Sequence, residues 1–478
     1  MKHHFTSHIS QALCTLLFGV AVLLFFGLAY PHHLHYQEQY QLFLFDSNYV
    51  WDIIRMPGGV ADLLGRFCTQ FFQFAWVGAA IIAVLLSLVQ LLTLRLAKWG
   101  WFYGLSFVPS FLLWIFLLDE HALLGGIWAV LLTQLAVWGL LRIMGTVLVC
   151  TPMCTRRTVP FVLLIIVTFF ILNWVAWGGS HYYRYPMVFP TLLYVAWVTA
   201  VILPFLVRWI TDTVLRNTIS KTGQRQQIIH FSLFTVTFII MMTLVWKNAN
   251  FKAEKVMQYD FMARHQQWNR ILGTINTEKP NNQIGVTVQN LALAMHGQLI
   301  DHLFDYNQNG IAGLLPDVQS DATSPLPTAE VHYQLGMISV AQRTVFEAQE
   351  AILDFQKSGR CYKRLAQTNL ILGSYEVARK YLMALQKTLF YRDWANETLP
   401  LLGNEEAIAK HPEYGRLRQM VCDKDYYFSD HVTPEMLEGL YACNTDNHLA
   451  LEYLKAYYVL TGDRENYAKL LLQNSAQQ

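Results

Sequence analysis

The first half of the chain consists largely of long apolar runs separated by short polar segments. A helix needs roughly 20 apolar residues to cross the hydrocarbon core of a bilayer. Seven runs meet this requirement, at residues 9–31, 71–94, 100–118, 122–141, 160–178, 187–207 and 230–246, and none has an Asp, Glu, Lys or Arg in its interior. The pattern predicts a bundle of seven transmembrane helices over residues 1–246.

The basic residues predict how this bundle is oriented. Lys2 precedes the first run, but the run ends in LAYPHH and lacks the small residues of a signal-peptidase site, so we interpret it as an uncleaved anchor. With the amino terminus in the cytoplasm, the cytoplasmic segments carry ten Lys and Arg residues. The outer loops then carry only three, Arg55, Arg66 and Arg184. Seven crossings place residues 247–478 on the outer side.

From residue 247 onward the hydropathy falls and a helical period takes over. Three stretches place a Gly turn between an apolar helix and an amphipathic one, with an Ala shortly afterwards: LGMISVA (335–341), LGSYEVA (372–378) and TGDRENYA (461–468). The Gly ends the first helix, and the small Ala allows the second helix to pack closely. The pattern resembles a tetratricopeptide-type array; the alternative is an irregular all-helical domain. A segment rich in Ser, Asp and Pro, 317–328, predicts a surface loop.

The composition agrees with this two-part organisation. Hydrophobic residues make up 54% of the chain and charged residues 14%, which argues against a disordered or nucleic-acid-binding protein. Residues 1–246 carry 13 basic and 7 acidic side chains, whereas residues 247–478 carry 22 and 26. The predicted fold class is therefore all-α, with a transmembrane domain at 1–246 and a soluble, extracytoplasmic helical domain at 247–478.

The acidic residues of the first half gather on the predicted outer face. Six of the seven lie there: Glu38, Asp46, Asp52, Asp62, Asp119 and Glu120. Acids contribute little to membrane insertion, so topology alone does not require this distribution. The alternative is that outer loops simply need polar residues. The first four belong to the first outer loop, 32–70.

The second part of that loop has the period of an amphipathic helix. Pro57, Gly58 and Gly59 interrupt the chain just before it. Apolar residues then recur at spacings of three and four, with Asp62 and Arg66 on the other side. We expect a helix that lies at the membrane surface and leads into the second span.

The sequence offers few motifs for a metal or cofactor site. His32, His33 and His35 with Glu38 offer suitable ligand types, but no second ligand pair lies nearby at a recognised spacing, so no metal is assigned. DYNQNG, at 305–310, opens like a calcium loop but has Pro where the bidentate Glu is required. The chain has no nucleophile elbow, P-loop, dinucleotide fingerprint or HExxH motif, and its cofactor remains unknown.

Three cysteines, Cys361, Cys422 and Cys443, fall in the second half. An oxidising compartment would permit a disulfide there. The pair Cys422 and Cys443 is the first to test, and the odd number leaves one thiol free.

In architecture the chain resembles the C-type superfamily of integral-membrane glycosyltransferases. The shared features are an inner amino terminus, a long first outer loop with acids and a surface helix, acids between spans three and four, and a helical carboxyl domain. The resemblance implies a polyprenyl-phosphate-linked sugar as donor and a catalytic Asp or Glu in the first outer loop, with further acids between spans three and four in some members. The matching positions are Glu38, Asp46 and Asp52 in the first loop, and Asp119 and Glu120 in the loop between spans three and four.

The chemistry of such an enzyme gives each group a role. A base must take a proton from the acceptor hydroxyl, and cations must hold the phosphate leaving group. Arg55, His181 and Arg184 are the candidate phosphate ligands.

A second resemblance rests on EQYQLF, followed by Tyr49 and PGG, together with the helical carboxyl domain. These features resemble a family of multi-pass proteins from Bacteroidota known only as a domain of unknown function. The resemblance implies a bacterial inner-membrane protein with a periplasmic domain.

Two functional hypotheses follow, with a weaker third. The first is an enzyme that uses membrane lipid in the form of a polyprenyl-phosphate sugar. The second is a non-catalytic envelope scaffold whose helical domain binds a periplasmic protein or peptide. An ion-coupled transporter fits less well, because the predicted spans offer only uncharged groups such as Gln90, Gln134 and Asn173. No nucleic-acid partner is expected.

Overall fold

The structure, a computed structural model, is built from α-helices and short helical turns. It describes residues 2–97, 103–149, 182–184, 188, 190–210, 223–317, 325–352, 356–422 and 434–477, and within these ranges it contains no β-strand. The chain divides into two compact units. The bundle unit comprises residues 1–38 and 45–251, and the helical unit comprises residues 39–44 and 252–478. We call the separate segment of the helical unit, residues 39–44, the strap.

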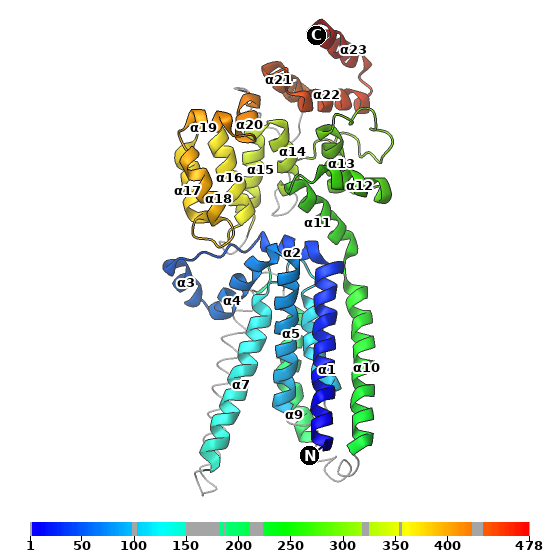
Figure 1. The fold of residues 1–478 in the computed structure, drawn as a ribbon, viewed down its shortest axis with the longest axis vertical. Coiled ribbons are helices and arrows are strands. Elements are labelled where there is room, and N and C mark those ends of the chain that lie inside the picture. The colour runs from blue at the N-terminus through cyan, green and yellow to red at the C-terminus, as the bar shows by residue number, and fades with distance from the viewer. Residues whose placement is uncertain are drawn as a thin grey trace. The chain divides into compact units, whose positions relative to one another are not determined.

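The bundle unit contains the longest helices of the chain (Figure 1). Its elements are α1 (Lys2–Leu24), a π-helical turn (Phe25–Ala29), α2 (Pro31–Glu38), α3 (Ser47–Ile54), α4 (Gly59–Thr69), a 3-10 turn (Gln70–Gln73), α5 (Ala75–Ala97), a 3-10 turn (Gly104–Phe107), α6 (Val108–Phe116), α7 (Gly125–Val149), α9 (Thr191–Ile210) and α10 (Gly223–Asn248).

Four described segments are long and apolar enough to cross a membrane: Ser10–Ala29, Ala75–Ala97, Gly125–Ile143 and Phe231–Asn248. They coincide with the first, second, fourth and seventh predicted spans. The third and sixth coincide with shorter apolar helices, Gly104–Phe116 and Thr191–Val207. The fifth, 160–178, lies outside the described residues. The structure therefore supports membrane association, and the count of seven stays a prediction.

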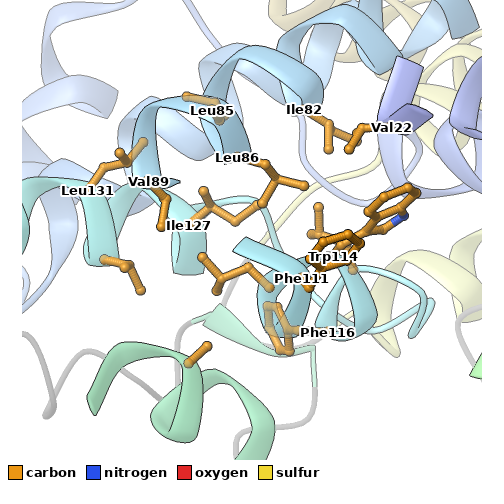
Figure 2. Close-up of a cluster of buried hydrophobic side chains, with 14 of the residues drawn as sticks. Val22, Ile82, Leu85, Leu86, Val89, Phe111, Trp114, Phe116, Ile127 and Leu131 are labelled. Atoms are coloured by element: carbon orange, nitrogen blue, oxygen red, sulfur yellow. The ribbon is translucent and has the colours of Figure 1, made fainter. Parts of the chain in front are cut away.

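The core of the bundle lies between α5 and the helices that pack around it, α1, α6, α7 and α9. Figure 2 shows side chains of α5, α6 and α7 interleaving there. Phe111 and Trp114 of α6 stack with ring centroids 5.7 Å apart, and Phe18 of α1 meets both rings edge-on. Such aromatic contacts add to the free energy gained by burial.

The polar groups inside the bundle join helix to helix. The Gln134 side-chain amide of α7 donates to the Thr93 hydroxyl of α5 at 2.8 Å and to the Ala200 carbonyl of α9 at 3.1 Å. The Gln90 amide donates to the Ser106 hydroxyl at 2.9 Å, and the Thr15 hydroxyl donates to the Gln90 carbonyl oxygen at 3.0 Å. These interhelical bonds are the structural role expected of uncharged polar groups in spans.

Helix α4 confirms the helix predicted in the first outer loop and shows which way its faces point. Asp62 is buried and accepts three hydrogen bonds from Arg66, one of 2.7 Å and two of 3.0 Å. On the apolar side, Val60 is 49% exposed and Phe67 is 38% exposed. The polar side of α4 therefore packs against the protein, and its apolar side is left for the surroundings, as a helix at a membrane surface requires.

The helical unit contains the remaining helices. They are α11 (Phe251–Arg264), whose first residue belongs to the bundle unit, α12 (Trp268–Glu278), α13 (Gln283–Met295), α14 (Pro325–Leu335), α15 (Ile338–Glu350), α16 (Gly359–Ile371), α17 (Tyr375–Leu385), α18 (Arg392–Thr398), a 3-10 turn (Leu399–Leu401), α19 (Glu405–Lys410), α20 (Tyr414–Met420), α21 (Pro434–Cys443), α22 (His448–Thr461) and α23 (Arg464–Gln477). Consecutive helices from α14 to α17 pack side by side (Figure 1).

The three predicted Gly turns are present. Gly336, Gly373 and Gly462 follow the last residues of α14, α16 and α22 with φ values of 90°, 79° and 74°, a left-handed conformation that glycine adopts without steric cost. Ala341 and Ala378 are fully buried, as close helix packing requires, but Ala468 is exposed. The prediction of a tightly packed Ala is therefore wrong for the third pair.

Two further predictions are resolved in this unit. Cys422 and Cys443 form a disulfide, which confirms the pairing, and Cys361 is a buried free thiol. The loop predicted over 317–328 is wrong at its end, because Pro325–Thr328 form the buried first turn of α14. Proline is well suited to a first helical turn, where its missing amide costs no hydrogen bond. Residues 318–324 lie outside the described part of the chain.

The crossing of α4 and α7 gives a test of the bundle. A Cβ on Gly65 would lie 2.5 Å from the backbone nitrogen of Gly125 and 2.7 Å from its Cα. We expect Gly65→Ala to push the helices apart and lower the free energy of unfolding by about 2 kcal/mol or more. Gly139→Ala in α7, where the added methyl meets nothing within 4 Å, is the matched control. Thermal unfolding of both variants in detergent measures the difference, and equal melting temperatures would contradict the close crossing.

Candidate functional site

A short backbone pairing brings together two loops of the bundle unit whose paired residues are 61 positions apart in sequence. Ala122 and Tyr183 form an isolated antiparallel bridge. The amide of Leu123 donates to the carbonyl of Tyr182 at 3.0 Å, and the amide of Arg184 donates to the carbonyl of His121 at 2.9 Å. The bridge gathers five side chains, Asp119, Glu120, His121, Tyr183 and Arg184, which we call the outer-loop cluster after the side on which the sequence predicts these loops.

Asp119 is held in place by two hydrogen bonds. Its carboxylate accepts one from the Tyr183 hydroxyl at 2.7 Å and one from the backbone amide of His121 at 2.9 Å. Bonds to an ionised carboxylate are among the stronger ones in proteins. Asp119 thus ties the two loops together and adds a fixed negative charge to the cluster.

Glu120 has the electrostatic setting of a proton-transfer group. Burial raises the pKa of its carboxyl above the usual value, the charge of Asp119 raises it further, and the guanidinium of Arg184 acts in the opposite direction. The imidazole Nε2 of His121 lies 3.9 Å from a Glu120 oxygen. Burial and the charge of Arg184 lower the pKa of His121, so its ring is largely neutral near pH 7. The cluster therefore combines an acid of raised pKa, a neutral imidazole and a permanent cation.

Helix α2 is joined to the same cluster. Arg184 donates to the Tyr36 hydroxyl at 3.1 Å and its guanidinium carbon lies 5.7 Å from the centre of the Tyr36 ring. The Gln37 side-chain amide donates to the Ala122 carbonyl at 3.0 Å. His33 bonds the Leu117 carbonyl at 2.8 Å, and complete burial lowers the pKa of its ring to about 4. His33 is therefore a neutral structural group that anchors α2.

The structure places the predicted site residues in different settings. Asp119, Glu120 and Arg184 come together in the outer-loop cluster, and Glu38 is buried at the end of α2, two residues after Tyr36.

The remaining predicted site residues do not belong to the outer-loop cluster. Asp46 caps α3, because its carboxylate accepts hydrogen bonds from the amides of Asn48 and Tyr49. Asp52 and Arg55 are exposed at the end of α3. His181 lies outside the described residues.

Sequence reasoning missed three members of this site, Tyr36, His121 and Tyr183. His121 follows two candidate acids directly, and Tyr183 precedes the candidate Arg184, so adjacency was the available signal. What the sequence does not display is the bridge that brings residues 119–121 next to 183–184.

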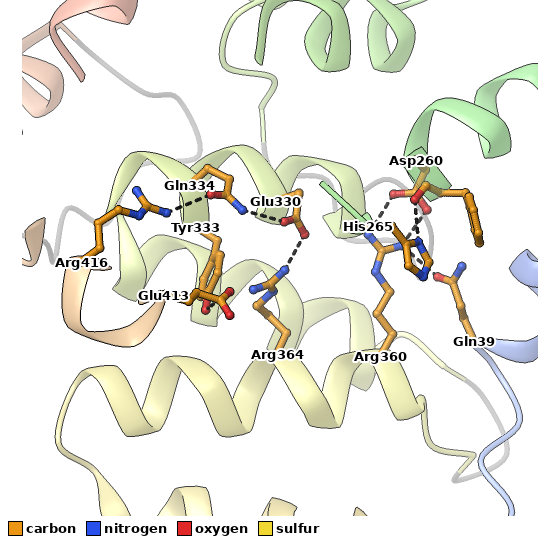
Figure 3. Close-up of polar contacts among 11 residues, drawn as sticks. Gln39, Asp260, His265, Glu330, Tyr333, Gln334, Arg360, Arg364, Glu413 and Arg416 are labelled. Atoms are coloured by element: carbon orange, nitrogen blue, oxygen red, sulfur yellow. Dashed lines mark hydrogen bonds and ion pairs between the residues drawn. The ribbon is translucent and has the colours of Figure 1, made fainter. Parts of the chain in front are cut away.

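A second polar cluster lies in the helical unit, where α14 and α16 carry charged groups into the core. Figure 3 shows them in a row. Arg360 donates to both oxygens of Asp260 at 2.6 and 2.9 Å. Arg364 donates to Glu330 at 2.6 Å, and its guanidinium carbon lies 3.6 Å above the Tyr333 ring. Buried charges require partners of this kind, and we interpret the row as a device that fixes how these helices pack.

The comparisons with known proteins show the family. A model of DUF6057, a family of unknown function, matches residues 7–477, and the chain therefore belongs to that family. No curated protein matches the chain. No solved structure matches it either. The expected match to an uncharacterised family is confirmed over nearly the whole chain.

The electrostatics of Glu120 can be tested by two changes that act in opposite directions. Asp119→Asn removes a negative charge and should lower the pKa of Glu120, whereas Arg184→Gln removes a positive charge and should raise it. A hydrophobic carbodiimide modifies protonated carboxyls, so mass spectrometry of the labelled Glu120 peptide as a function of pH reports the midpoint. Shifts in the same direction for both variants would contradict the cluster.

Proposed function

We propose that the protein is a glycosyltransferase-like enzyme of the inner membrane that uses a polyprenyl-phosphate-linked sugar, with the outer-loop cluster as its reaction site. The observation that carries the proposal is the placement of Glu120, an acid of raised pKa, within the electrostatic range of Arg184 and beside His121. These groups are of the kinds that transfer from a lipid phosphate requires.

The acid supplies the proton chemistry. A sugar on a lipid phosphate is already activated, and the step that needs help is removal of a proton from the acceptor hydroxyl as the glycosidic bond forms. A raised pKa brings a carboxylate closer to the working pH, where it is a better base than an ordinary surface Glu. Glu120 is the base in this proposal, and Asp119, held by Tyr183 and the His121 amide, positions its neighbour.

The cation supplies the phosphate chemistry. As the bond to the sugar breaks, negative charge grows on the departing polyprenyl phosphate, and a guanidinium stabilises it by charge and by hydrogen bonds. Arg184 is held in place by its bond to Tyr36 and by its backbone bond to His121, so little reorganisation is needed when the phosphate arrives. Glu38, at the end of the same α2 helix as Tyr36, is the first-loop acid that we keep in the proposal.

The predicted topology puts this site at the outer face of the membrane. We propose seven spans, a cytoplasmic amino terminus, a periplasmic helical domain of tetratricopeptide type and an origin in Bacteroidota. The four described candidate spans and the excess of basic residues in the predicted cytoplasmic segments support this placement.

One observation favours a second candidate function, an envelope scaffold that binds peptides through its helical unit. That unit encloses the strap, an uncharged segment without regular secondary structure, among its helices. A surface that holds one such segment has the chemistry to hold a partner's peptide.

Turnover tests the enzyme. Purified protein in liposomes is incubated with a panel of polyprenyl-phosphate sugars as donors and with periplasmic glycan or protein as the hydroxyl-bearing acceptor, and release of the lipid phosphate is followed by chromatography. We expect Glu120→Gln to reduce turnover by roughly 10²- to 10⁴-fold, the usual contribution of a general base. We expect Arg184→Ala to weaken binding of polyprenyl phosphate as well. The matched control is Glu376→Gln, whose side chain is 83% exposed on α17.

The Glu120→Gln and Arg184→Ala variants must elute as the wild type does in size-exclusion chromatography before their turnover is compared. Full activity of a folded Glu120→Gln variant would remove Glu120 as the base. No turnover by the wild type on any donor, together with no binding of polyprenyl phosphate, would overturn the proposed function in favour of the scaffold.

Reporter fusions test the topology. Alkaline phosphatase fused after residue 250 should be active in a bacterial host, and green fluorescent protein at the same position should be dark, because seven crossings carry this point outside. A fusion within residues 143–149, predicted to be cytoplasmic, should give the opposite pair of results. A fluorescent fusion after residue 250 would contradict seven crossings from a cytoplasmic amino terminus.

A further inference from the structure

The strap belongs to the helical unit, although the residues before and after it in sequence belong to the bundle unit. Its sequence, QYQLFL, carries no charge, and it has no regular helix or strand. Even so, its first five residues are all buried: Gln39, Tyr40, Gln41, Leu42 and Phe43. A loop that only connects two helices normally lies exposed on the surface. The contacts that Gln39, Leu42 and Leu44 make within the helical unit indicate a binding site for the strap there.

Leu42 is the apolar anchor of the strap. Its side chain is 7% exposed and belongs to a cluster with four fully buried residues of α16, α17 and α18: Ala366, Leu382, Leu385 and Ala395. Its backbone amide donates to the carbonyl of Lys357 at 2.9 Å, just before α16 begins. An extended peptide is commonly recognised in this way, by a main-chain hydrogen bond together with a pocket for one side chain.

Gln39 is the polar anchor. Its side-chain carbonyl accepts a hydrogen bond of 2.9 Å from Nη1 of Arg360, on the first turn of α16 (Figure 3). Arg360 is itself held by both oxygens of Asp260, so a second partner fixes its orientation. Because Asp260 already balances the charge of Arg360, this position suits a neutral amide better than a second carboxylate.

We propose that α16, α17 and α18 form a peptide-recognition surface for uncharged segments of the pattern Gln-x-x-Leu, and that its occupant is the strap of the same chain. Arg360 binds the Gln side chain, and the apolar cluster that includes Ala366 and Leu382 packs against the Leu three residues later. Recognition is local to the surface and the segment, so the same sequence supplied as a separate peptide binds once the strap has been displaced.

The surface has a consequence for the first outer loop. The strap makes up most of the segment that joins α2 to α3. Gln39 directly follows Glu38, and Leu44 lies two residues before Asp46, so a bound strap restricts the backbone next to both acids. This consequence rests on the proposed function wherever it concerns the role of Glu38 in catalysis. The recognition itself does not depend on that role.

Displacement of the strap in the full-length protein tests the recognition. In Leu42→Asp a charge replaces the apolar anchor, and a labelled peptide covering residues 38–45, EQYQLFLF, is added in trans. We expect the peptide to bind this variant and not the wild type, whose surface is occupied. A peptide with Asp in place of the Leu that corresponds to Leu42 should bind neither the variant nor the wild type. The matched control is Val377→Asp, a change of the same kind at a 40% exposed position on α17, and it should behave as the wild type.

Hydrogen exchange gives a second readout that does not need the peptide. The backbone amide of residue 42 should exchange slowly in the wild type and in Val377→Asp. In Leu42→Asp the amide at the same position should exchange at least about tenfold faster. Gln39→Ala covers the case in which Leu42→Asp does not fold. It removes only the polar anchor and leaves the Arg360–Asp260 pair intact, and we expect a smaller increase in exchange.

Each outcome decides a claim. If the backbone amides of the wild-type strap exchange as fast as those of an open loop, the proposed binding of the strap to this surface is wrong. A folded Leu42→Asp variant that exchanges fast but does not bind the peptide overturns recognition in trans. The proposed function fails independently: if Glu120→Gln keeps full turnover while the peptide binds Leu42→Asp, the enzyme site is wrong and the surface stands.

Discussion

The position of the strap in the helical unit depends on the buried guanidinium of Arg360. Its bonds connect three segments that are distant in sequence, at residues 39, 260 and 360. Burial opposes the charge, yet Asp260 holds the pKa of Arg360 above its usual value, so the charge persists. A charge of this kind is tolerated inside a protein only when its partner is already in place. The contact between α11 and the start of α16 is therefore part of the site that binds Gln39.

The bundle unit treats its polar groups in two different ways. Inside the bundle, Gln90 and Gln134 are hydrogen-bonded between helices, where their bonds fix the packing. In the outer-loop cluster, Glu120 and His121 lie 3.9 Å apart, too far for a hydrogen bond, with their pKa values displaced in opposite directions. These displacements move the two pKa values toward each other, and groups with perturbed pKa values cluster at functional sites. This difference, more than the number of acids in the loops, directs attention to residues 119–121.

What could be predicted from the sequence follows from periodicity and local chemistry. Apolar runs located the four described candidate spans, the Gly turns located the ends of α14, α16 and α22, and the helical period located α4. The disulfide was foreseeable because few cysteines were available to pair. Each of these signals lies within a short window of sequence.

The rest depends on contacts between distant segments. Tyr183 meets Asp119 only because an isolated bridge pairs two loops, and one bridge leaves no repeating pattern to recognise. The strap is too short and too irregular to show a period, so QYQLFL reads as part of a loop rather than as a core segment of another unit. The direction of α4 was equally hidden, since an amphipathic pattern separates two faces without saying which one the protein covers.

The strap changes what the helical unit is as a folding module. A fragment that begins at residue 252 lacks the strap, so it would expose the seat of Leu42 on α16, α17 and α18 and leave the Nη1 of Arg360 with one partner fewer. An exposed apolar seat binds other proteins without regard to function and promotes aggregation. Capture of a partner by such a fragment would therefore not establish a scaffold. The informative fragment carries residues 39–44 joined through a flexible linker, because only then is the surface in the state that the full chain gives it.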